Sequence, residues 1–284
     1  MSAAGIETHR SMVKAWECDS FGHFTVAYYF DRLADASATA RETFGVPRGW
    51  RSTEYLARFL SELRAGEAFH IESGIIDLAD GAPRLGHRLL NSASGKPCTT
   101  IEEHVEAKAG GAVLSAAERA DLETHRVSWE RSKDDPGFAD QAVEGLIATA
   151  RDRVRPAELD GAGGLGLAGY VHRSSIGCIQ LLTAMGLSPD YLRKFRRGFS
   201  TFEMKLRLDE PGPLAGDALV VTSGLMQLGT SSVRMIHRVS EAGTGRRVAT
   251  LRQSGVHFDL EARRSTAIPD DLRAKAASLV MRQS

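Results

Sequence analysis

The spacing of apolar residues predicts two long helices at corresponding places along the chain. From Val26 to Phe44, apolar residues recur at intervals of three and four, which is the period of an amphipathic helix, and Gly45 and Pro47 then supply a stop signal. The segment from Leu167 to Met185 has the same period and ends before Gly186-Leu-Ser-Pro189. It carries few charged residues. We therefore expect two helices that are largely buried.

Strand-like segments follow each helix and are separated by short turns. Short links favour antiparallel pairing, because parallel strands need a crossover connection of a dozen or more residues. Each half of the chain is therefore predicted to be an α+β domain, with a mostly antiparallel sheet wrapped around one long helix. The predicted strands are Ala68 to Leu78, Arg84 to Asn91 and Cys98 to Val105, then Ala218 to Leu228, Ser232 to Ser240 and Arg247 to His257.

The two halves are copies of one domain. Val13, Glu17, Asp19 and Gly22 recur in register as Val154, Glu158, Asp160 and Gly163, at a constant offset of 141 positions. After the helix the offset becomes 150, which pairs His87 with His237 and indicates a nine-residue insertion near Arg196 to Pro213. We predict a first domain over residues 1–122, a connecting segment over 123–150 and a second domain over 151–284.

Composition and charge narrow the function classes. The 284 residues suit about two domains. Lysine plus arginine and aspartate plus glutamate both number 36, so we expect neither a general nucleic-acid binder nor a membrane-surface protein. No secretory signal or membrane-spanning run is evident, and we expect a cytoplasmic protein. The scattered Cys18, Cys98 and Cys178 argue against a disulfide framework or a structural zinc site, and no metal is expected.

A short motif before the first helix carries the candidate chemistry. The segment from Trp16 to Phe30 reads Trp-Glu-Cys-Asp19-Ser-Phe-Gly22-His23-Phe-Thr25-Val-Ala-Tyr-Tyr-Phe. It resembles the hotdog-fold acyl-CoA thioesterases of the 4-hydroxybenzoyl-CoA thioesterase type. That family has an Asp after the first strand, a Gly-His or Gly-Val pair three residues on, often an Asn, and then an aromatic-rich central helix. Thr25 stands where the Asn is common.

The resemblance implies two tandem hotdog domains, a double hotdog, that hydrolyse an acyl thioester. It further implies active sites at the seam between two hotdog units, both of which would here come from one chain. The implied partner is a small-molecule acyl-CoA, bound as substrate, with no separate cofactor. Pairing of such chains into a homo-oligomer is left open by the sequence.

Thioester hydrolysis needs a carboxylate to activate water or attack the carbonyl, donors for the oxyanion, and a dry acyl pocket. We predict Asp19 as base or nucleophile, and unpaired backbone amides of Gly22, His23 and Phe24 at the helix start as oxyanion donors. The His23 side chain is expected to support them. Gly22 is expected to let the acyl carbonyl approach the backbone. The alternative is that Asp19 only caps the helix, as Asp often does.

The second copy retains Asp160 but has Gly164 in place of the histidine. It is either a second site with different properties or a degenerate copy, and we favour degeneracy. The Gly164-x-Gly166-x-x-Gly169 spacing resembles a dinucleotide fingerprint, but no βαβ unit surrounds it, so nucleotide-cofactor binding is not expected.

Two further sets of basic residues admit a structural and a functional interpretation. His87 and His237 recur at equivalent strand positions, which suggests a shared structural role or a phosphate contact, and we favour the structural role. Several basic residues after the helices are either solvated loop residues or contacts for CoA phosphates. These are Arg48, Arg51, Arg193, Lys194, Arg196 and Arg197.

Three functions compete at this stage. The first is an acyl-CoA thioesterase. The second is an enoyl-CoA hydratase or dehydratase on the same fold, which usually carries an Asp-x-x-x-x-His pair, one residue longer than the spacing of Asp19 and His23. The third is a non-catalytic acyl-CoA-binding module. The sequence leaves the acyl chain, and the choice between CoA and carrier-protein thioesters, undetermined.

Overall fold

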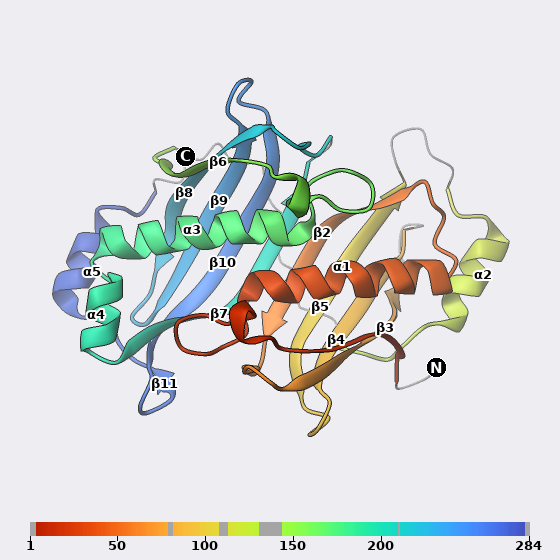
Figure 1. The fold of residues 1–284 in the computed structure, drawn as a ribbon, viewed down its shortest axis with the longest axis horizontal. Coiled ribbons are helices and arrows are strands. Elements are labelled where there is room, and N and C mark those ends of the chain that lie inside the picture. The colour runs from red at the N-terminus through yellow and green to blue at the C-terminus, as the bar shows by residue number, and fades with distance from the viewer. Residues whose placement is uncertain (1–3, 79–81, 108–112, 131–143, 210, 282–284) are drawn as a thin grey trace. The chain divides into compact units, whose positions relative to one another are not determined.

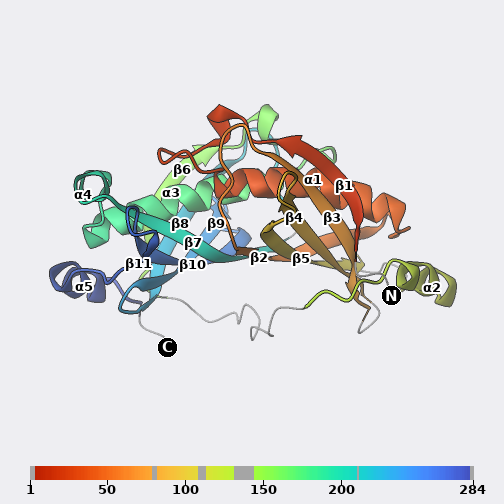
Figure 2. The same ribbon diagram turned by 90° about the horizontal axis from the view of Figure 1, so that it is seen from below.

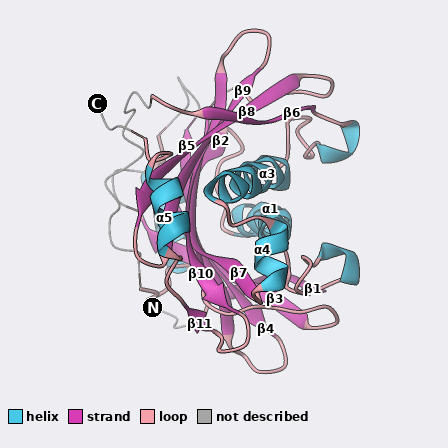
Figure 3. Ribbon diagram, turned by 90° about the vertical axis from the view of Figure 1, so that its left-hand side faces the viewer, coloured by secondary structure: helices cyan, strands magenta, loops and turns pink. Residues whose placement is uncertain are grey.

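The chain forms two compact units, residues 1–135 and 136–284. The structure, a computed structural model, describes residues 4–78, 82–107, 113–130, 144–209 and 211–281. Each unit contains one long helix and an antiparallel sheet, and the strands of each unit curve around its helix (Figure 3). This is the α+β arrangement predicted from the sequence.

The first unit is built around helix α1 (Figure 1). Its strands pair antiparallel in the order β1-β3-β4-β5-β2. A short 3-10 turn, η1, and a second helix, α2, complete the unit. The elements are β1 (Ile6–Met12), η1 (Ala15–Glu17), α1 (Val26–Thr43), β2 (Trp50–Phe59), β3 (Ala68–Asp77), β4 (Arg84–Asn91), β5 (Pro97–Ala107) and α2 (Ala116–Thr124).

The second unit repeats this plan around helix α3. Its strands pair antiparallel in the order β6-β8-β9-β10-β7, and β11 adds to β10. The elements are β6 (Ile147–Arg153), η3 (Pro156–Glu158), α3 (Leu167–Met185), α4 (Pro189–Lys194), β7 (Arg197–Leu208), β8 (Ala218–Leu228), β9 (Ser232–Glu241), β10 (Arg247–Asp259), β11 (Arg264–Ser265) and α5 (Asp270–Ala277).

Burial explains why both helices form where the apolar period predicted them. The inner face of α1 buries Phe30, Leu33 and Ala36 completely, and the helix packs mainly on β1 and β3, beside which it runs in Figure 2. Helix α3 ends at Gly186, whose φ of 93° is the left-handed conformation that glycine adopts most readily. In the second core, Leu272 and Ala276 of α5 belong to the same cluster as Met185.

Three details of the predicted organisation are wrong. Strands β2 and β7 were not predicted. The extra residues of the second copy mostly form α4, before β7, whereas we predicted the insertion near Arg196 to Pro213. The predicted connection of 123–150 is too long: Ile75 pairs with His125 and Val127 through backbone hydrogen bonds, and β6 already belongs to the second unit.

Candidate functional site

The Asp19 side chain organises the turn that leads into α1. Its Oδ1 accepts hydrogen bonds from the backbone amides of Phe21 (2.8 Å) and His23 (3.0 Å). The backbone carbonyl of Asp19 accepts from the Gly22 amide at 3.0 Å, and the Asp19 amide donates to the His23 carbonyl at 2.8 Å. The second carboxylate oxygen, Oδ2, lies outside this turn network, and 41% of the Asp19 side chain is exposed. One oxygen therefore stabilises the loop, and the other faces its surroundings.

The prediction that the Gly22, His23 and Phe24 amides are unpaired at the helix start is wrong. Helix α1 begins at Val26, as the apolar period predicted, and these three amides precede it and already donate within the protein, the Phe24 amide to the Leu63 carbonyl at 2.8 Å. The first helical amides, those of Val26 and Ala27, have no acceptor within the described residues. Thr25 does not cap them with its side chain.

The second unit repeats this turn almost bond for bond. Asp160 Oδ1 accepts from the amides of Ala162 (2.9 Å) and Gly164 (3.1 Å), and its amide donates to the Gly164 carbonyl at 2.8 Å. Because both copies make these bonds, they account for an aspartate at each position without any chemistry. Any catalytic role of Asp19 therefore rests on Oδ2 and on what surrounds it.

Gly22 has a conformational reason to be glycine. Its φ is 78°, and that of the equivalent Gly163 is 84°. Both lie in the left-handed region, where side chains other than glycine are disfavoured. A Cβ on Gly22 would meet only Arg64 Nη1, at 3.9 Å. The backbone of the turn therefore explains a glycine in both copies, without the substrate contact that we predicted for Gly22.

His23 lies within a charged cluster that the sequence analysis did not include. Its Nδ1 is 3.9 Å from Asp19 Oδ2, and its Nε2 is 3.2 Å from Glu62 Oε2 and 2.9 Å from Arg64 Nη2. Glu62 and Arg64 come from the segment between β2 and β3, which pairs with the turn through a bridge between His23 and Arg64. The His23 side chain is 17% exposed. The imidazole is thus held between two carboxylates and a guanidinium.

The second unit replaces the three other residues of this cluster, His23 and its two partners Glu62 and Arg64. Leu63 and Pro213 occupy equivalent positions in the two units. The backbone carbonyl of each accepts a hydrogen bond from the amide that follows the aspartate turn of its own unit. His23, Glu62 and Arg64 then correspond to Gly164, Gly212 and Leu214. The charged cluster is therefore specific to the first unit, whereas the turn itself is common to both. The 150-residue offset was applied only from Gly66 onward. Applied to Glu62 and Arg64 as well, it would have shown from the sequence that the second unit lacks both charges.

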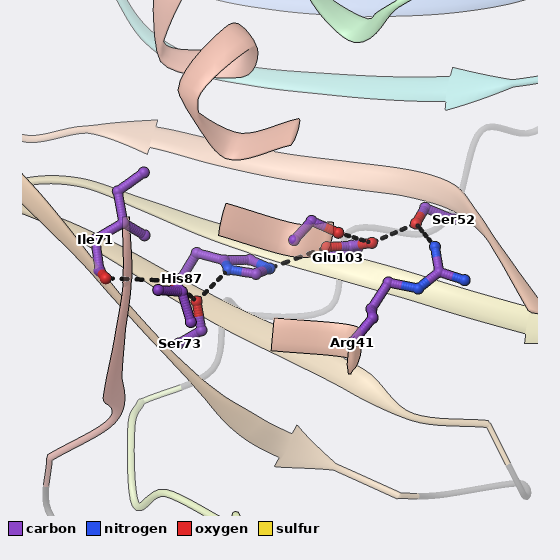
Figure 4. A network of polar contacts seen from close by, with 8 residues as sticks. Arg41, Ser52, Ile71, Ser73, His87 and Glu103 are labelled. Atoms are coloured by element: carbon purple, nitrogen blue, oxygen red, sulfur yellow. Dashed lines mark hydrogen bonds and ion pairs between the residues drawn. The ribbon is translucent and has the colours of Figure 1, made fainter. Parts of the chain in front are cut away.

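A second polar network lies inside the first unit, between α1 and the sheet (Figure 4). It runs in the order of the strands, through hydrogen bonds from Thr8 to Ser73 (2.7 Å), Ser73 to His87 Nδ1 (2.8 Å) and His87 Nε2 to Glu103 Oε2 (2.9 Å). Glu103 Oε1 accepts from Ser37 of α1 at 2.9 Å and from Ser52 of β2. These hydrogen bonds connect all five strands of the first unit, β1 to β5, with helix α1.

The second unit has the same network with neutral residues at its centre. Thr149 bonds Ser223 (2.7 Å) and Ser223 bonds His237 Nδ1 (2.8 Å). Gln253 replaces the glutamate and donates to Thr201 at 2.6 Å, while Cys178 stands in place of Ser37. His87, Glu103 and His237 are at most 2% exposed, so a substrate cannot reach them. This placement supports the structural role that we favoured for the two histidines.

The remaining candidates do not form a comparable site. Three of the basic residues after α3 form ion pairs: Arg193 with Asp190, Arg196 with Glu261 and Arg197 with Asp259. In the described parts of the chain, no three His, Cys, Asp or Glu side chains gather as ligands for a metal ion. None of the described helices combines the length and the apolar character needed to cross a membrane.

Known proteins match this architecture. The model of the thioesterase-like superfamily matches residues 13–111 and 154–276, one segment in each unit, which confirms the tandem double hotdog. A search of curated proteins finds no match.

Solved structures match along most of the chain. An acyl-ACP thioesterase from Bacteroides thetaiotaomicron is 11% identical (TM-score 0.62), with 88% of this chain and 96% of that chain covered. A 12:0-ACP thioesterase from Umbellularia californica is 10% identical (TM-score 0.62), with 88% and 93% covered. A protein of Lactobacillus plantarum, provisionally assigned as an oleoyl thioesterase, is 12% identical (TM-score 0.63), with 89% and 96% covered. At these identities the likeness concerns the fold, and the two family segments establish that the chain belongs to the thioesterase-like superfamily.

Proposed function

We propose that the protein hydrolyses acyl thioesters, with acyl-CoA as the substrate class, at the Asp19 turn of the first unit. The observation that carries this proposal is the charged cluster beside Asp19: His23 Nδ1 lies 3.9 Å from Asp19 Oδ2, and Glu62 and Arg64 contact the other ring nitrogen of His23. The second unit keeps the turn and lacks the cluster. A structural requirement of the turn alone would not explain that difference, whereas one working site per chain would.

In this proposal Asp19 Oδ2 acts as the general base. It takes a proton from a water molecule, whose oxygen then attacks the thioester carbonyl carbon. The negative charge that develops on the carbonyl oxygen needs a hydrogen-bond donor. We assign that role to the Val26 amide, because Val26 is partly exposed while Ala27 is fully buried. The carbon–sulfur bond then breaks, and the thiolate takes up the proton held by Asp19, which leaves a free acid and a thiol.

The test measures free-thiol release from short, branched, long and aromatic acyl-CoAs and from matching acyl carrier protein thioesters. Asp19→Asn removes the charge but keeps a side-chain oxygen that can hold the turn. Asp160→Asn makes the same change in the equivalent turn and is the matched control. We expect turnover to fall by about 100-fold or more in Asp19→Asn, the scale of general base catalysis, and to persist in Asp160→Asn.

Other outcomes identify the competing functions. Loss of activity only in Asp160→Asn would place the site in the second unit. Consumption of an enoyl-CoA double bond without thiol release would favour a hydratase. Stabilisation by acyl-CoA without any turnover would favour a binding module.

A further inference from the structure

Glu62 and Arg64 contact the same nitrogen of His23, and they require opposite states of it. Arg64 Nη2, at 2.9 Å, can only donate, so its hydrogen bond needs a lone pair on Nε2. Glu62 Oε2, at 3.2 Å, can only accept when ionised, so its hydrogen bond needs a proton on Nε2. A neutral imidazole carries one ring proton. Each of the two partners therefore stabilises a different tautomer of His23.

The choice between these tautomers decides what His23 presents to Asp19. With the lone pair on Nε2, the proton is on Nδ1 and points to Asp19 Oδ2, 3.9 Å away. With the proton on Nε2, the Nδ1 lone pair faces that carboxylate, which is unfavourable. The 3.9 Å separation is too long for a hydrogen bond, but catalytic hydrogen bonds often shorten only when substrate binds. Asp19 Oδ1 is already held by two amides, and His23 Nδ1 lies on the side of the reactive Oδ2, where a proton on Nδ1 can orient that oxygen.

We propose that Arg64 is a positioning residue that selects the Nδ1–H tautomer of His23, so that the ring donates to Asp19 Oδ2. Glu62 is the competing acceptor. It lies 3.8 Å from Arg64 Nη2 and 3.2 Å from His23 Nε2, where it can accept a hydrogen bond only from a protonated Nε2. The catalytic part of this inference rests on the proposed function, whereas the tautomer itself does not.

The second unit argues against a purely structural role for Arg64. The hydrogen bond from the backbone amide at this position to a carboxylate three residues on is kept there without the arginine: the Arg64 amide donates to Glu67 Oε2 at 2.7 Å, and the Leu214 amide donates to Asp217 Oδ2 at 2.8 Å. The segment therefore folds with leucine at this position. Arg64→Leu is accordingly a variant that we expect to fold, and it changes the partner of His23 selectively.

The test is nitrogen-15 NMR of the histidine rings in the full chain, which distinguishes a protonated ring nitrogen from one with a lone pair. The signals of His23, one of nine histidines, are assigned by their absence in His23→Gln. In the neutral ring we expect the Nδ1–H form in the wild type, in Glu62→Gln and in Arg64→Lys, which keeps a donor. We expect a switch to the Nε2–H form in Arg64→Leu. Arg48→Leu removes an exposed arginine beyond the other end of α1 and is the matched control for the NMR experiment, in which its His23 signals are expected to match those of the wild type.

An Nε2–H form in the wild type, or no switch in Arg64→Leu, would overturn the proposal. In thioester hydrolysis we expect Arg64→Leu to lower kcat by roughly 10- to 100-fold with little change in KM, since orientation is lost rather than binding. Arg64→Lys should recover part of that loss. An equal loss of kcat in Arg64→Leu and Arg64→Lys would refute the positioning role. A tautomer switch in a protein that hydrolyses no thioester would refute the proposed function and leave the tautomer assignment supported.

Discussion

His87 Nε2 lies 2.9 Å from Glu103 Oε2 in the interior of the first unit, where neither side chain is more than 2% exposed. Burial by itself raises the pKa of Glu103, but hydrogen bonds and charge from His87, with the hydroxyls of Ser52 and Ser37, outweigh it and lower that pKa. These partners therefore favour the ionised form of Glu103 inside the sheet. The second unit places the neutral Gln253 at the same point.

The first prediction concerns this difference between the units. Glu103→Gln copies the second unit and can keep a neutral hydrogen-bond network, so we expect it to cost about 1 kcal/mol in unfolding free energy. Glu103→Ala leaves buried partners unsatisfied and should cost roughly 3–5 kcal/mol. Urea unfolding followed by tryptophan fluorescence reports on the first unit, because Trp16, Trp50 and Trp129 all lie there.

The reverse change, Gln253→Glu, completes that comparison. Cys178 replaces one of the two hydroxyl donors of the first unit, so a charge at position 253 would be poorly satisfied. We expect it to destabilise the second unit more than Glu103→Gln destabilises the first. Equal costs for Glu103→Gln and Glu103→Ala would contradict the role assigned to the network.

The second prediction is a pH dependence of the second unit. Burial lowers the pKa of His237 from 6.5 to about 4, and the neighbouring Gln253 opposes this only in part. Between these values the unfolded chain binds a proton that the folded chain does not, so stability falls as the pH is lowered from about 6.5 towards 4. At about 1.4 kcal/mol per pKa unit, the full effect is roughly 3 kcal/mol.

Protection of the buried Cys178 from a thiol reagent, measured between pH 7.5 and 5 in increasing urea, follows the stability of this unit. His237→Gln should reduce the pH dependence. His87→Gln, the equivalent change in the first unit, should leave it in place. Identical pH slopes in His237→Gln and the wild type would show that another group is responsible.

The third prediction concerns the cysteines. Cys98 and Cys178 are buried, and burial raises the pKa of the Cys178 thiol to about 12, so neither should react while the protein is folded. Cys18 is only partly buried and should react with a thiol reagent in the native state. We expect one reactive thiol per chain, which Cys18→Ser removes. More than one reactive thiol per chain would mean that the core around Cys98 or Cys178 opens readily. The single thiol of Cys18 also sets the background of the thiol-release assay.

The fourth prediction separates conformation from substrate access at Gly22. Gly22→Ala and Gly163→Ala place a side chain at a positive φ in equivalent turns, so each should cost about 1–2 kcal/mol of stability. If the positive φ is the whole reason for glycine, the two variants lower the midpoint of thermal unfolding by similar amounts. The kcat/KM of Gly22→Ala then falls only as far as its fraction of folded protein falls. A larger loss of kcat/KM in Gly22→Ala alone would restore the predicted close approach of the acyl carbonyl.

The sequence was informative where one physical signal dominates. The apolar period defined α3 as Leu167 to Met185 and α1 to within one residue of its end at Thr43. Strand β2 was missed because its inward positions include Thr53 and Ala57, which weaken the alternation of apolar and polar residues. Residues of β7 were assigned to an insertion because they follow the extra helix α4.

The sequence by itself determined the duplicated α+β design and the turn around Asp19, since both depend on residues close together in the chain. Only the tertiary structure placed Glu62 and Arg64 against His23, because that contact depends on the pairing of the turn with the segment after β2. It also showed that the backbone amides of residues 22–24 already donate hydrogen bonds within the protein. Hydrogen bonds between distant segments leave no local pattern, and they decide which groups of this site remain free to act.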